Sequence, residues 1–348
     1  MSPPRRYGKD PQQLISKLED LIERRDEFAG ADLVFSMLES VFKLVRDGAG
    51  RGDLKMLHHA LLELRYAMKV FAPYRSIRKV SIFGSARTKS DEPEYRLAEE
   101  LANRVTRLGY MVITGAGPGI MEAAQDGAGR SKSFGVNIRL PFESEANEVI
   151  QDDSKLVHFK YFFTRKVVFL KETDAIVIFP GGFGTHDEAF ESLTLVQTGK
   201  GAMVPIVFID KPGGTYWREW LTYMETQLRD GGYIDERDTS LFMVTESVDK
   251  AVDEVHRFYS NYHSSRFVLP RLVMRFQNPI SDEVVEELNE SYSDIIVAGK
   301  IRKLAGPLPV EENEPHTHGL HRLAFQYDRR SYGRLRQLID RMNSLGAP

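Results

Sequence analysis

The sequence predicts an α/β fold, in which a mostly parallel sheet is covered by helices on both faces. Two observations predict this fold. From about Arg78 to Tyr259, short apolar runs alternate with stretches of helical periodicity, a rhythm that is typical of parallel sheets. Glycine-rich turns also follow several apolar runs, at the ends of expected strands, where open α/β sheets bind their ligands.

The order of the elements follows from the apolar runs and from the amphipathic stretches between them. Strands are expected at Val80–Phe83, Met111–Thr114, Phe134–Ile138, Leu156–Phe159, Ala175–Phe179, Ile206–Ile209 and Leu241–Val244. Helices are expected between them at Pro93–Leu108, Gly119–Gly129, Phe162–Lys171, Thr185–Thr198, Tyr216–Arg229 and Val248–Tyr259.

The segments on both sides of this region have a different pattern of apolar residues. Residues 1–74 form an N-terminal segment in which apolar residues recur at helical spacing from residue 10 onward. Residues 75–262 form the α/β domain, and residues 263–348 form a small α+β appendage. In the appendage, strands are expected at Phe267–Phe276 and Leu320–Tyr327, helices at Ser281–Ser293 and Tyr332–Met342, and a polar loop at Lys303–Pro315.

The composition excludes several classes of function. The chain has 348 residues, 42% of them hydrophobic, and a net charge of −3 from 47 basic and 50 acidic residues. This balance disfavours a general nucleic-acid binder, which is usually basic. The absence of cysteine excludes disulfides, thiolate chemistry and cysteine-bound metal. No apolar run is long enough to cross a membrane and the start is polar, so a cytoplasmic protein is expected.

The segment Pro180–Glu188 is the most informative motif of the chain. It follows the apolar run Ala175–Phe179 and opens the amphipathic stretch that begins near Ala189. A strand, a glycine-rich turn and a helix start in succession place free backbone N–H groups and the positive helix end together, which favours an anion. Glu188 faces the same space, so the motif combines an anion cradle with a potential acid or base.

A structural role for the same residues is equally open. Thr185-x-x-Glu188 has the pattern of a capping box, in which the Thr185 hydroxyl binds the Glu188 N–H and the Glu188 side chain reaches back. Any helix start can use such a pair. From the residues alone, Glu188 is therefore either a catalytic carboxylate or a helix cap.

Three further segments lie at or near the ends of expected strands: Phe83–Arg87, Thr114–Glu122 and the Arg165-Lys166 pair. The second is close to a dinucleotide fingerprint but fails it, because Ile120 stands where glycine is required and no acid ends the next strand. Its turn is either a cradle for ribose or phosphate or a tight turn needed for packing. Arg165-Lys166 is either part of a site or a solvated helix face.

Two weaker candidates have simpler explanations. His316, His318 and His321 have metal-like spacing, but most of the segment lies in a loop without a fixed acidic partner. The turn at Gly213–Thr215 follows a strand and is either a second anion site or a plain turn before a helix. Tyr216 and Trp217 beside it are expected to be packing residues.

At this point the motifs resemble those of the LONELY GUY (LOG) family. Pro180–Glu188 reads as the family signature PGGxGTxxE, and Arg165-Lys166 matches the Arg-Lys pair that precedes the signature in the family. Thr114–Glu122 resembles the family's glycine-rich turn, and Phe83-Gly84-Ser85 resembles its first loop. The resemblance covers about residues 78–259, roughly half the chain.

The resemblance implies a Rossmann-like, doubly wound fold and a function. The function is hydrolysis of the N-glycosidic bond of a nucleoside 5′-monophosphate, AMP or a cytokinin riboside monophosphate, to free base and ribose 5-phosphate. It implies no cofactor and no metal, a homo-oligomer that is a dimer or larger, and neither nucleic acid nor membrane as a partner. The older family label of lysine decarboxylase is not supported, because no lysine has the setting of a pyridoxal-phosphate site.

The resemblance also implies which residues form the site, by their positions in the family motifs. Arg165 and Glu188 are expected to be catalytic. The residues expected to bind the substrate are Gly84, Ser85, Arg87, Gly117, Gly119, Glu122, Lys166, Gly181, Gly182, Gly184 and Thr185.

The chain departs from the family pattern in two respects. Both flanks lie outside the compact family core, and His186-Asp187 replaces the commoner pair of an apolar residue and glutamate. Purine monophosphates such as AMP are therefore a safer substrate class than cytokinin nucleotides. A nucleotide-binding regulator without turnover is the alternative function, and a protein whose flanks serve mainly for interaction is a third.

Overall fold

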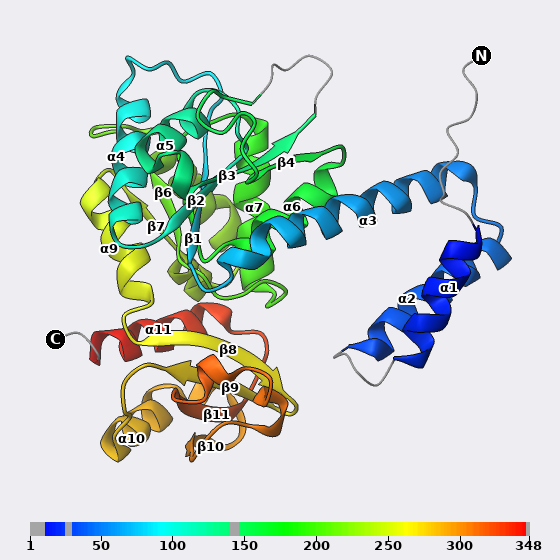
Figure 1. The fold of residues 1–348 in the computed structure, drawn as a ribbon. Helices are drawn as coiled ribbons and strands as arrows, with labels where there is room; N and C mark the ends of the chain where they lie inside the picture. Colours follow the sequence, from blue (N-terminus) through cyan, green and yellow to red (C-terminus); the bar gives the residue numbers. More distant parts are fainter. Residues whose placement is uncertain (1–10, 25–29, 140–145, 346–348) are drawn as a thin grey trace. The chain divides into compact units, whose positions relative to one another are not determined.

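The computed structural model describes residues 11–24, 30–139 and 146–345 (Figure 1). It divides the chain into two compact units, residues 1–59 and residues 60–348. The smaller unit consists of α1 (Pro11–Glu23), α2 (Ala31–Arg46) and the first half of α3 (Arg51–Phe71). The helical periodicity of the N-terminal segment is thus confirmed. The second half of α3 belongs to the larger unit, where Ala67 and Phe71 are buried.

A seven-stranded parallel sheet organises the larger unit. Its strands lie in the order β4-β3-β2-β1-β5-β6-β7. All seven strands were predicted from the sequence to within one or two residues at each end. Their bounds are β1 Lys79–Phe83, β2 Met111–Thr114, β3 Ser133–Ile138, β4 Leu156–Phe159, β5 Ala175–Ile178, β6 Ile206–Ile209 and β7 Phe242–Thr245.

Helices cover both faces of this sheet, which confirms the doubly wound α/β class. One face packs against α4 (Pro93–Arg107), α5 (Ile120–Ala128) and α9 (Val248–Phe258). The other packs against the end of α3, α6 (Phe162–Glu172), α7 (Phe183–Gln197) and α8 (Tyr216–Tyr223), which continues as a π-helical segment, Met224–Arg229. The two groups of helices lie on opposite sides of the strands in Figure 1.

Alternation along the strands produces these two cores. In β5, Ala175 and Val177 belong to the first apolar cluster, whereas Ile176 and Ile178 belong to the second. All four side chains are buried, because successive residues of a strand point to opposite faces and both faces are covered.

The chain reverses its direction across the sheet between β1 and β5. From β1 it builds outward through β2 and β3 to β4, then returns to β5 and builds outward on the other side to β7. The neighbouring strands β1 and β5 therefore mark a topological switch point, where the strand order reverses. Ligands of open α/β sheets bind at such a switch point.

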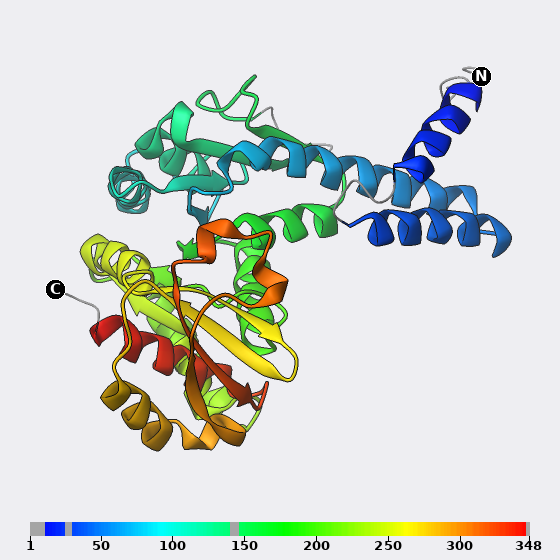
Figure 2. The same ribbon diagram turned by 60° about the horizontal axis from the view of Figure 1, so that its bottom comes forward.

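The C-terminal part contains an antiparallel sheet with strand order β10-β11-β9-β8 and two helices, α10 (Asp282–Ser291) and α11 (Tyr332–Leu345) (Figure 2). Two expectations are wrong here. Phe267–Phe276 is not one strand but parts of a hairpin, β8 (Tyr262–Val268) and β9 (Arg271–Phe276). The strand β10 (Ile296–Leu304), which pairs with β11 (His321–Tyr327), was not predicted at all.

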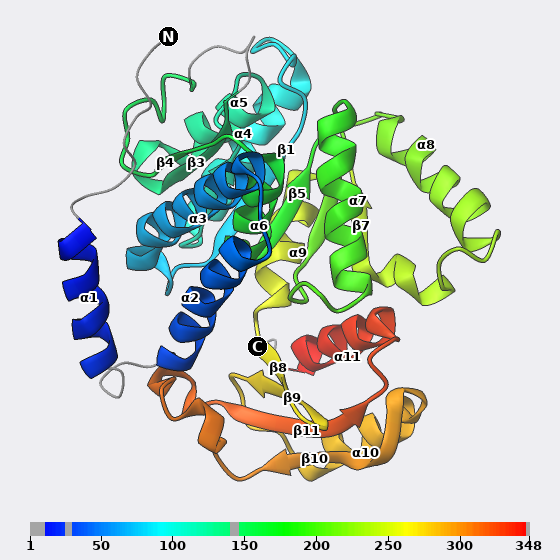
Figure 3. The same ribbon diagram turned by 90° about the vertical axis from the view of Figure 1, so that its right-hand side faces the viewer.

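The α/β part and the C-terminal part share one apolar cluster. Helix α11 lies between the small sheet and the α/β part (Figure 3), and its Leu335 and Ile339 are buried in the same cluster as Leu193 of α7. Arg336 of α11 also forms a buried ion pair with Glu254 of α9. Among the described residues, no helix is long and apolar enough to cross a membrane.

Candidate functional site

Three of the predicted segments meet at the switch point, and Ser85 joins them. Its backbone N–H donates a hydrogen bond to the carbonyl of Pro180 at 3.0 Å. Its own carbonyl accepts a hydrogen bond from the N–H of Ile120 at 3.1 Å. The turns after β1, β2 and β5 are therefore held together by their backbones.

Two glycines make this close approach of the turns sterically allowed. Gly119 has φ +70°, and a Cβ on it would lie 2.4 Å from the carbonyl oxygen of Ser85. A Cβ on Gly181 would lie 2.1 Å from the Thr185 hydroxyl oxygen. Both distances are shorter than van der Waals contact. A side chain at Gly119 would push apart the turns after β1 and β2, and one at Gly181 would clash with Thr185 of its own segment and lie only 3.0 Å from the backbone nitrogen of Ser85. The packing interpretation of the turn Gly115–Gly119 thus holds at Gly119.

The N-terminus of α7 carries no side-chain cap, so the predicted capping box is wrong. The helix begins at Phe183, two residues before the expected start, with Gly182 as its N-cap residue. Thr185 is therefore the third helical residue, and its N–H donates to the Gly182 carbonyl at 3.0 Å. The N–H groups of the first residues of a helix have no intrahelical acceptor, and Gly182 and Gly184 are exposed. An uncapped, positive helix end thus lies beside the three turns.

Glu188 and Arg165 form a buried ion pair next to this helix end. Arg165 Nη2 lies 3.3 Å from Glu188 Oε1, and the two side chains are 15% and 4% exposed. A Cβ on Gly115 would lie 3.9 Å from Arg165 Nη1, so the arginine also reaches the turn after β2. The structure thus brings both expected catalytic residues together.

Burial dominates the electrostatics of Glu188. It raises the pKa of the carboxyl group, while the positive charges of Lys166 and Arg165 oppose this rise. Lys166 itself is paired with two other carboxylates of α7, those of Asp187 at 2.8 Å and Glu191 at 2.6 Å. Because the side chains of Arg165 and Lys166 are mostly buried, a solvated helix face is excluded for this pair.

The remaining predicted residues line the three turns. The Ser85 hydroxyl oxygen accepts the N–H of Arg87 at 3.0 Å, and Arg87 is exposed. Gly84 lies close to Ile120, and a Cβ on this glycine would lie only 2.7 Å from the Ile120 side chain. Glu122 lies in the first turn of α5, where burial raises the pKa of its carboxyl group and the charges of Asp126 and Glu148 raise it further. These residues lie in or next to the turns at the switch point.

Two asparagines hold the turn after β2, and neither role was predicted from the sequence. Asn147 donates from its backbone to the carbonyl of Ala116 and from its side chain to the carbonyl of Gly117, both at 2.9 Å. Asn137 donates to the carbonyl of Gly115 at 3.2 Å. Contacts with backbone carbonyls leave no residue pattern, because every residue offers such a carbonyl.

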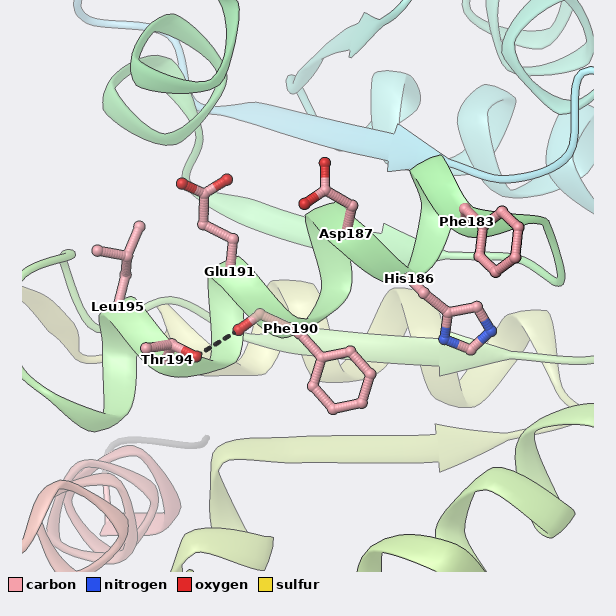
Figure 4. Close-up of a pocket in the computed structure, with 7 residues that line it drawn as sticks. All are labelled: Phe183, His186, Asp187, Phe190, Glu191, Thr194 and Leu195. Carbon is pink, nitrogen blue, oxygen red and sulfur yellow. Dashed lines mark hydrogen bonds between the residues drawn. The ribbon is translucent and has the colours of Figure 1, made fainter. Parts of the chain in front are cut away.

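The expectation that Tyr216 only packs is incomplete. Its ring contacts Trp217, but its hydroxyl donates a hydrogen bond to the carbonyl of Gly181 at 2.5 Å. An open groove of about 450 Å³ runs along the outer face of α7 and is lined by Phe183, His186, Asp187, Phe190, Glu191, Thr194 and Leu195 (Figure 4). Glu188 is not among the residues that line this groove.

The weaker candidates resolve into structural roles. The carboxylate of Asp210 occupies the turn at Gly213–Thr215, where a Cβ on Gly214 would lie 2.3 Å from its carboxyl oxygen. It also accepts the N–H of Trp217 at 3.4 Å, so the turn is a plain helix start. His318 lies 3.0 Å from the carbonyl oxygen of Glu311. Within residues 11–24, 30–139 and 146–345, no three histidine or acidic side chains are grouped to hold a metal ion.

Comparison with protein families supplies the deciding observation. The family model described as "possible lysine decarboxylase" matches residues 121–255, which include Arg165 and Glu188. The matched stretch lies within the part of the chain whose motifs resemble the LONELY GUY family. The family resemblance that the sequence motifs indicated is thereby confirmed. No curated protein matches the sequence.

Several solved structures align with about half of the chain. The protein TM1055 is 24% identical, and the alignment covers 52% of this chain and 99% of TM1055 with a TM-score of 0.38. The molybdenum cofactor carrier protein of Chlamydomonas reinhardtii is 18% identical over 52% of this chain and 97% of its own, with a TM-score of 0.36. The DNA processing protein A of Helicobacter pylori, which binds single-stranded DNA, is 15% identical over 51% of this chain and 79% of its own, also at 0.36. Likeness at this level assigns none of these activities to the chain.

Proposed function

We propose that the α/β part of the chain hydrolyses the N-glycosidic bond of a nucleoside 5′-monophosphate and releases the free base and ribose 5-phosphate. AMP or another purine nucleoside monophosphate is the expected substrate class. Cytokinin riboside monophosphates form a narrower group within this class. One observation carries the proposal: the buried Glu188–Arg165 pair lies beside an uncapped helix N-terminus at the switch point of the sheet.

The N-terminus of α7 provides the binding site for the substrate phosphate. Free N–H groups at the start of α7 and the positive end of its dipole favour a dianion there. Because Gly182 and Gly184 have no side chain and are exposed, a phosphate can approach the backbone closely. The phosphate then holds the ribose and its glycosidic bond close to Glu188.

The Glu188–Arg165 ion pair supplies the charged groups that cleavage of the glycosidic bond requires. Departure of the base leaves positive charge on the sugar, as in glycoside hydrolysis. A carboxylate at Glu188 stabilises this charge or orients the attacking water, and a positioned general base contributes about 10²–10⁴-fold. The Arg165 guanidinium helps to keep Glu188 ionised despite its burial and offsets negative charge on the phosphate or the leaving base.

A nucleotide-binding regulator is the competing function. Glu188 is already paired with Arg165, and such a pair can also serve as a structural contact. This alternative predicts tight binding of AMP without release of adenine.

The products of the reaction separate the two functions. The purified chain is incubated with AMP, a panel of other nucleoside monophosphates, and adenosine as a control without phosphate. The proposal predicts equal amounts of adenine and ribose 5-phosphate from AMP, and no cleavage of adenosine. Binding of AMP with no adenine released would instead establish the regulator.

A further inference from the structure

Two side chains form a relay of hydrogen bonds onto the turn before α7. The Tyr216 hydroxyl lies 2.5 Å from the carbonyl oxygen of Gly181. Nε2 of His186, a residue in the first turns of α7, lies 2.7 Å from the same hydroxyl oxygen. The rings of His186 and Tyr216 also face each other, with centroids 5.9 Å apart.

The direction of the relay follows from the available protons. A tyrosine hydroxyl has one proton, and the carbonyl of Gly181 is only an acceptor. Tyr216 therefore donates to Gly181, and His186 donates from Nε2 to the oxygen of Tyr216. Burial raises the pKa of Tyr216, so the hydroxyl keeps its proton, and burial lowers the pKa of His186.

The acceptor belongs to the peptide unit that joins Gly181 to Gly182, the N-cap residue of α7. The Gly181–Gly182 peptide joins two residues without Cβ atoms, so rotation of this unit meets few steric barriers. A Cβ on Gly182 would meet no atom within 4 Å, and Gly182 is exposed. In a trans peptide the carbonyl and the following N–H point in opposite directions. A carbonyl fixed toward Tyr216 therefore fixes the N–H of Gly182 on the opposite side.

We propose that Tyr216, supported by His186, is a positioning residue that holds the N–H of Gly182 in the orientation that binds the substrate phosphate. This inference rests on the proposed function, because the phosphate cradle is its premise.

The test compares Tyr216→Phe with Tyr223→Phe, a matched change in an exposed tyrosine of the same helix. Binding of ribose 5-phosphate is measured by titration calorimetry, and KM and kcat are measured with AMP. Tyr216→Phe is expected to weaken ribose 5-phosphate binding and to raise KM by about fivefold to tenfold, as loss of one hydrogen bond does, with a smaller effect on kcat. Tyr223→Phe is expected to match the wild type.

Variants of His186 test the second step of the relay. His186→Gln retains an N–H donor and is expected to bind ribose 5-phosphate almost as well as the wild type. His186→Phe retains a ring but has no donor, and weaker binding is expected. Unfolding curves show whether each variant is folded before its binding is compared.

Equal ribose 5-phosphate affinity of folded Tyr216→Phe and wild type would overturn the relay, as would a loss of kcat with KM unchanged. No binding of ribose 5-phosphate by the wild type would overturn it as well. A wild type that binds ribose 5-phosphate but releases no base from any nucleotide contradicts only the proposed hydrolysis. The comparison of binding between the variants still decides the relay in that case.

Discussion

Glu188 combines a buried carboxylate with nearby charges of both signs. Burial raises its pKa, the charges of Lys166 and Arg165 lower it, and those of Glu191 and Asp187 raise it. An enzyme that needs the ionised form must retain enough positive charge around this group. Lys166 is therefore as relevant to the chemistry of the site as Arg165, although it pairs with other carboxylates.

The pH dependence of turnover follows from these charges. In the proposed hydrolysis the ionised form of Glu188 is the active one. Because burial raises the pKa of Glu188, turnover is expected to decline on acidification already at a pH above the range in which a glutamate ordinarily titrates. Lys166→Met removes a charge that lowers this pKa, so the acid limb of the kcat profile should move to higher pH. Lys171→Met, a change in an exposed lysine of the same helix, is the control and should leave the limb in place. An acid limb at the same pH in Lys166→Met and wild type would show that Lys166 does not tune Glu188.

Individual residues of the site were predictable only where they form a pattern along the chain. Arg165 and Glu188 stand in motifs, and the structure brings them together. Tyr216 and Asn147 act on backbone carbonyls 35 and 30 positions away, and no pattern in the sequence marks such contacts. The capping box at Thr185 was a false signal, because the helix begins as soon as the chain leaves Gly182.

At the scale of elements, the site is an assembly of three turns rather than one loop. Its geometry depends on how closely the turns after β1 and β2 approach each other, and Gly119 sets this distance. The nearest backbone atom, the carbonyl oxygen of Ser85, belongs to the turn after β1. A change in one turn is therefore expected to disturb binding at another.

Gly119→Ala tests this dependence. The new methyl group would clash with Ser85 and its φ would be strained, so we expect lower stability and a loss of ribose 5-phosphate binding. Gly129→Ala is the matched control, since Gly129 has φ +74° but no atom within 4 Å of a Cβ. It should lose about 1–3 kcal/mol of stability from backbone strain, because φ +74° with ψ 154° is a conformation that suits glycine almost alone. It should retain binding, as shown by urea unfolding and calorimetry. Equal loss of binding in both variants would contradict the role of the Ser85 contact.

The elements of the parallel sheet were predicted well because both of its faces are buried. Such strands read as short, continuous apolar runs, and the glycine turns mark their ends. Prediction failed in the small sheet. There β10 is an edge strand whose residues are mostly exposed, so its sequence reads as a polar segment. The turn between β8 and β9 is only two residues long, and its Leu269 hides the break within an apolar run.

At the scale of the whole molecule, the α/β part and the C-terminal part of the larger unit are expected to unfold together. They share one apolar cluster, and the side chains of Glu254 and Arg336, 3% and 5% exposed, pair between α9 and α11. Removal of one partner of a buried pair leaves an uncompensated charge, which costs about 3–5 kcal/mol. The division of the chain into segments 1–74, 75–262 and 263–348 stays a prediction.

Arg336→Ala is therefore expected to lower the free energy of unfolding by about 3–5 kcal/mol in a single transition followed by urea and fluorescence. Arg341→Ala, on the same helix, breaks a pair with Glu287 whose side chains are 39% and 40% exposed. This control is expected to change stability by about 0–1 kcal/mol. Two separate transitions in the wild type, or equal losses in the two variants, would contradict a shared core joined by the buried pair.

In the proposed function, Glu188 takes part in cleavage of the N-glycosidic bond of a nucleotide that the start of α7 holds by its phosphate. The most direct measurement follows adenine released from AMP by wild type, Glu188→Gln and Glu191→Gln, together with calorimetric binding of AMP. Glu191 is the control, because it lies on the same helix but pairs with Lys166. Glu188→Gln is expected to bind AMP but to release adenine at least about 10²-fold more slowly, which is the contribution of a general base. Glu191→Gln is expected to stay active. Adenine release by Glu188→Gln at the rate of the wild type would contradict this role of Glu188.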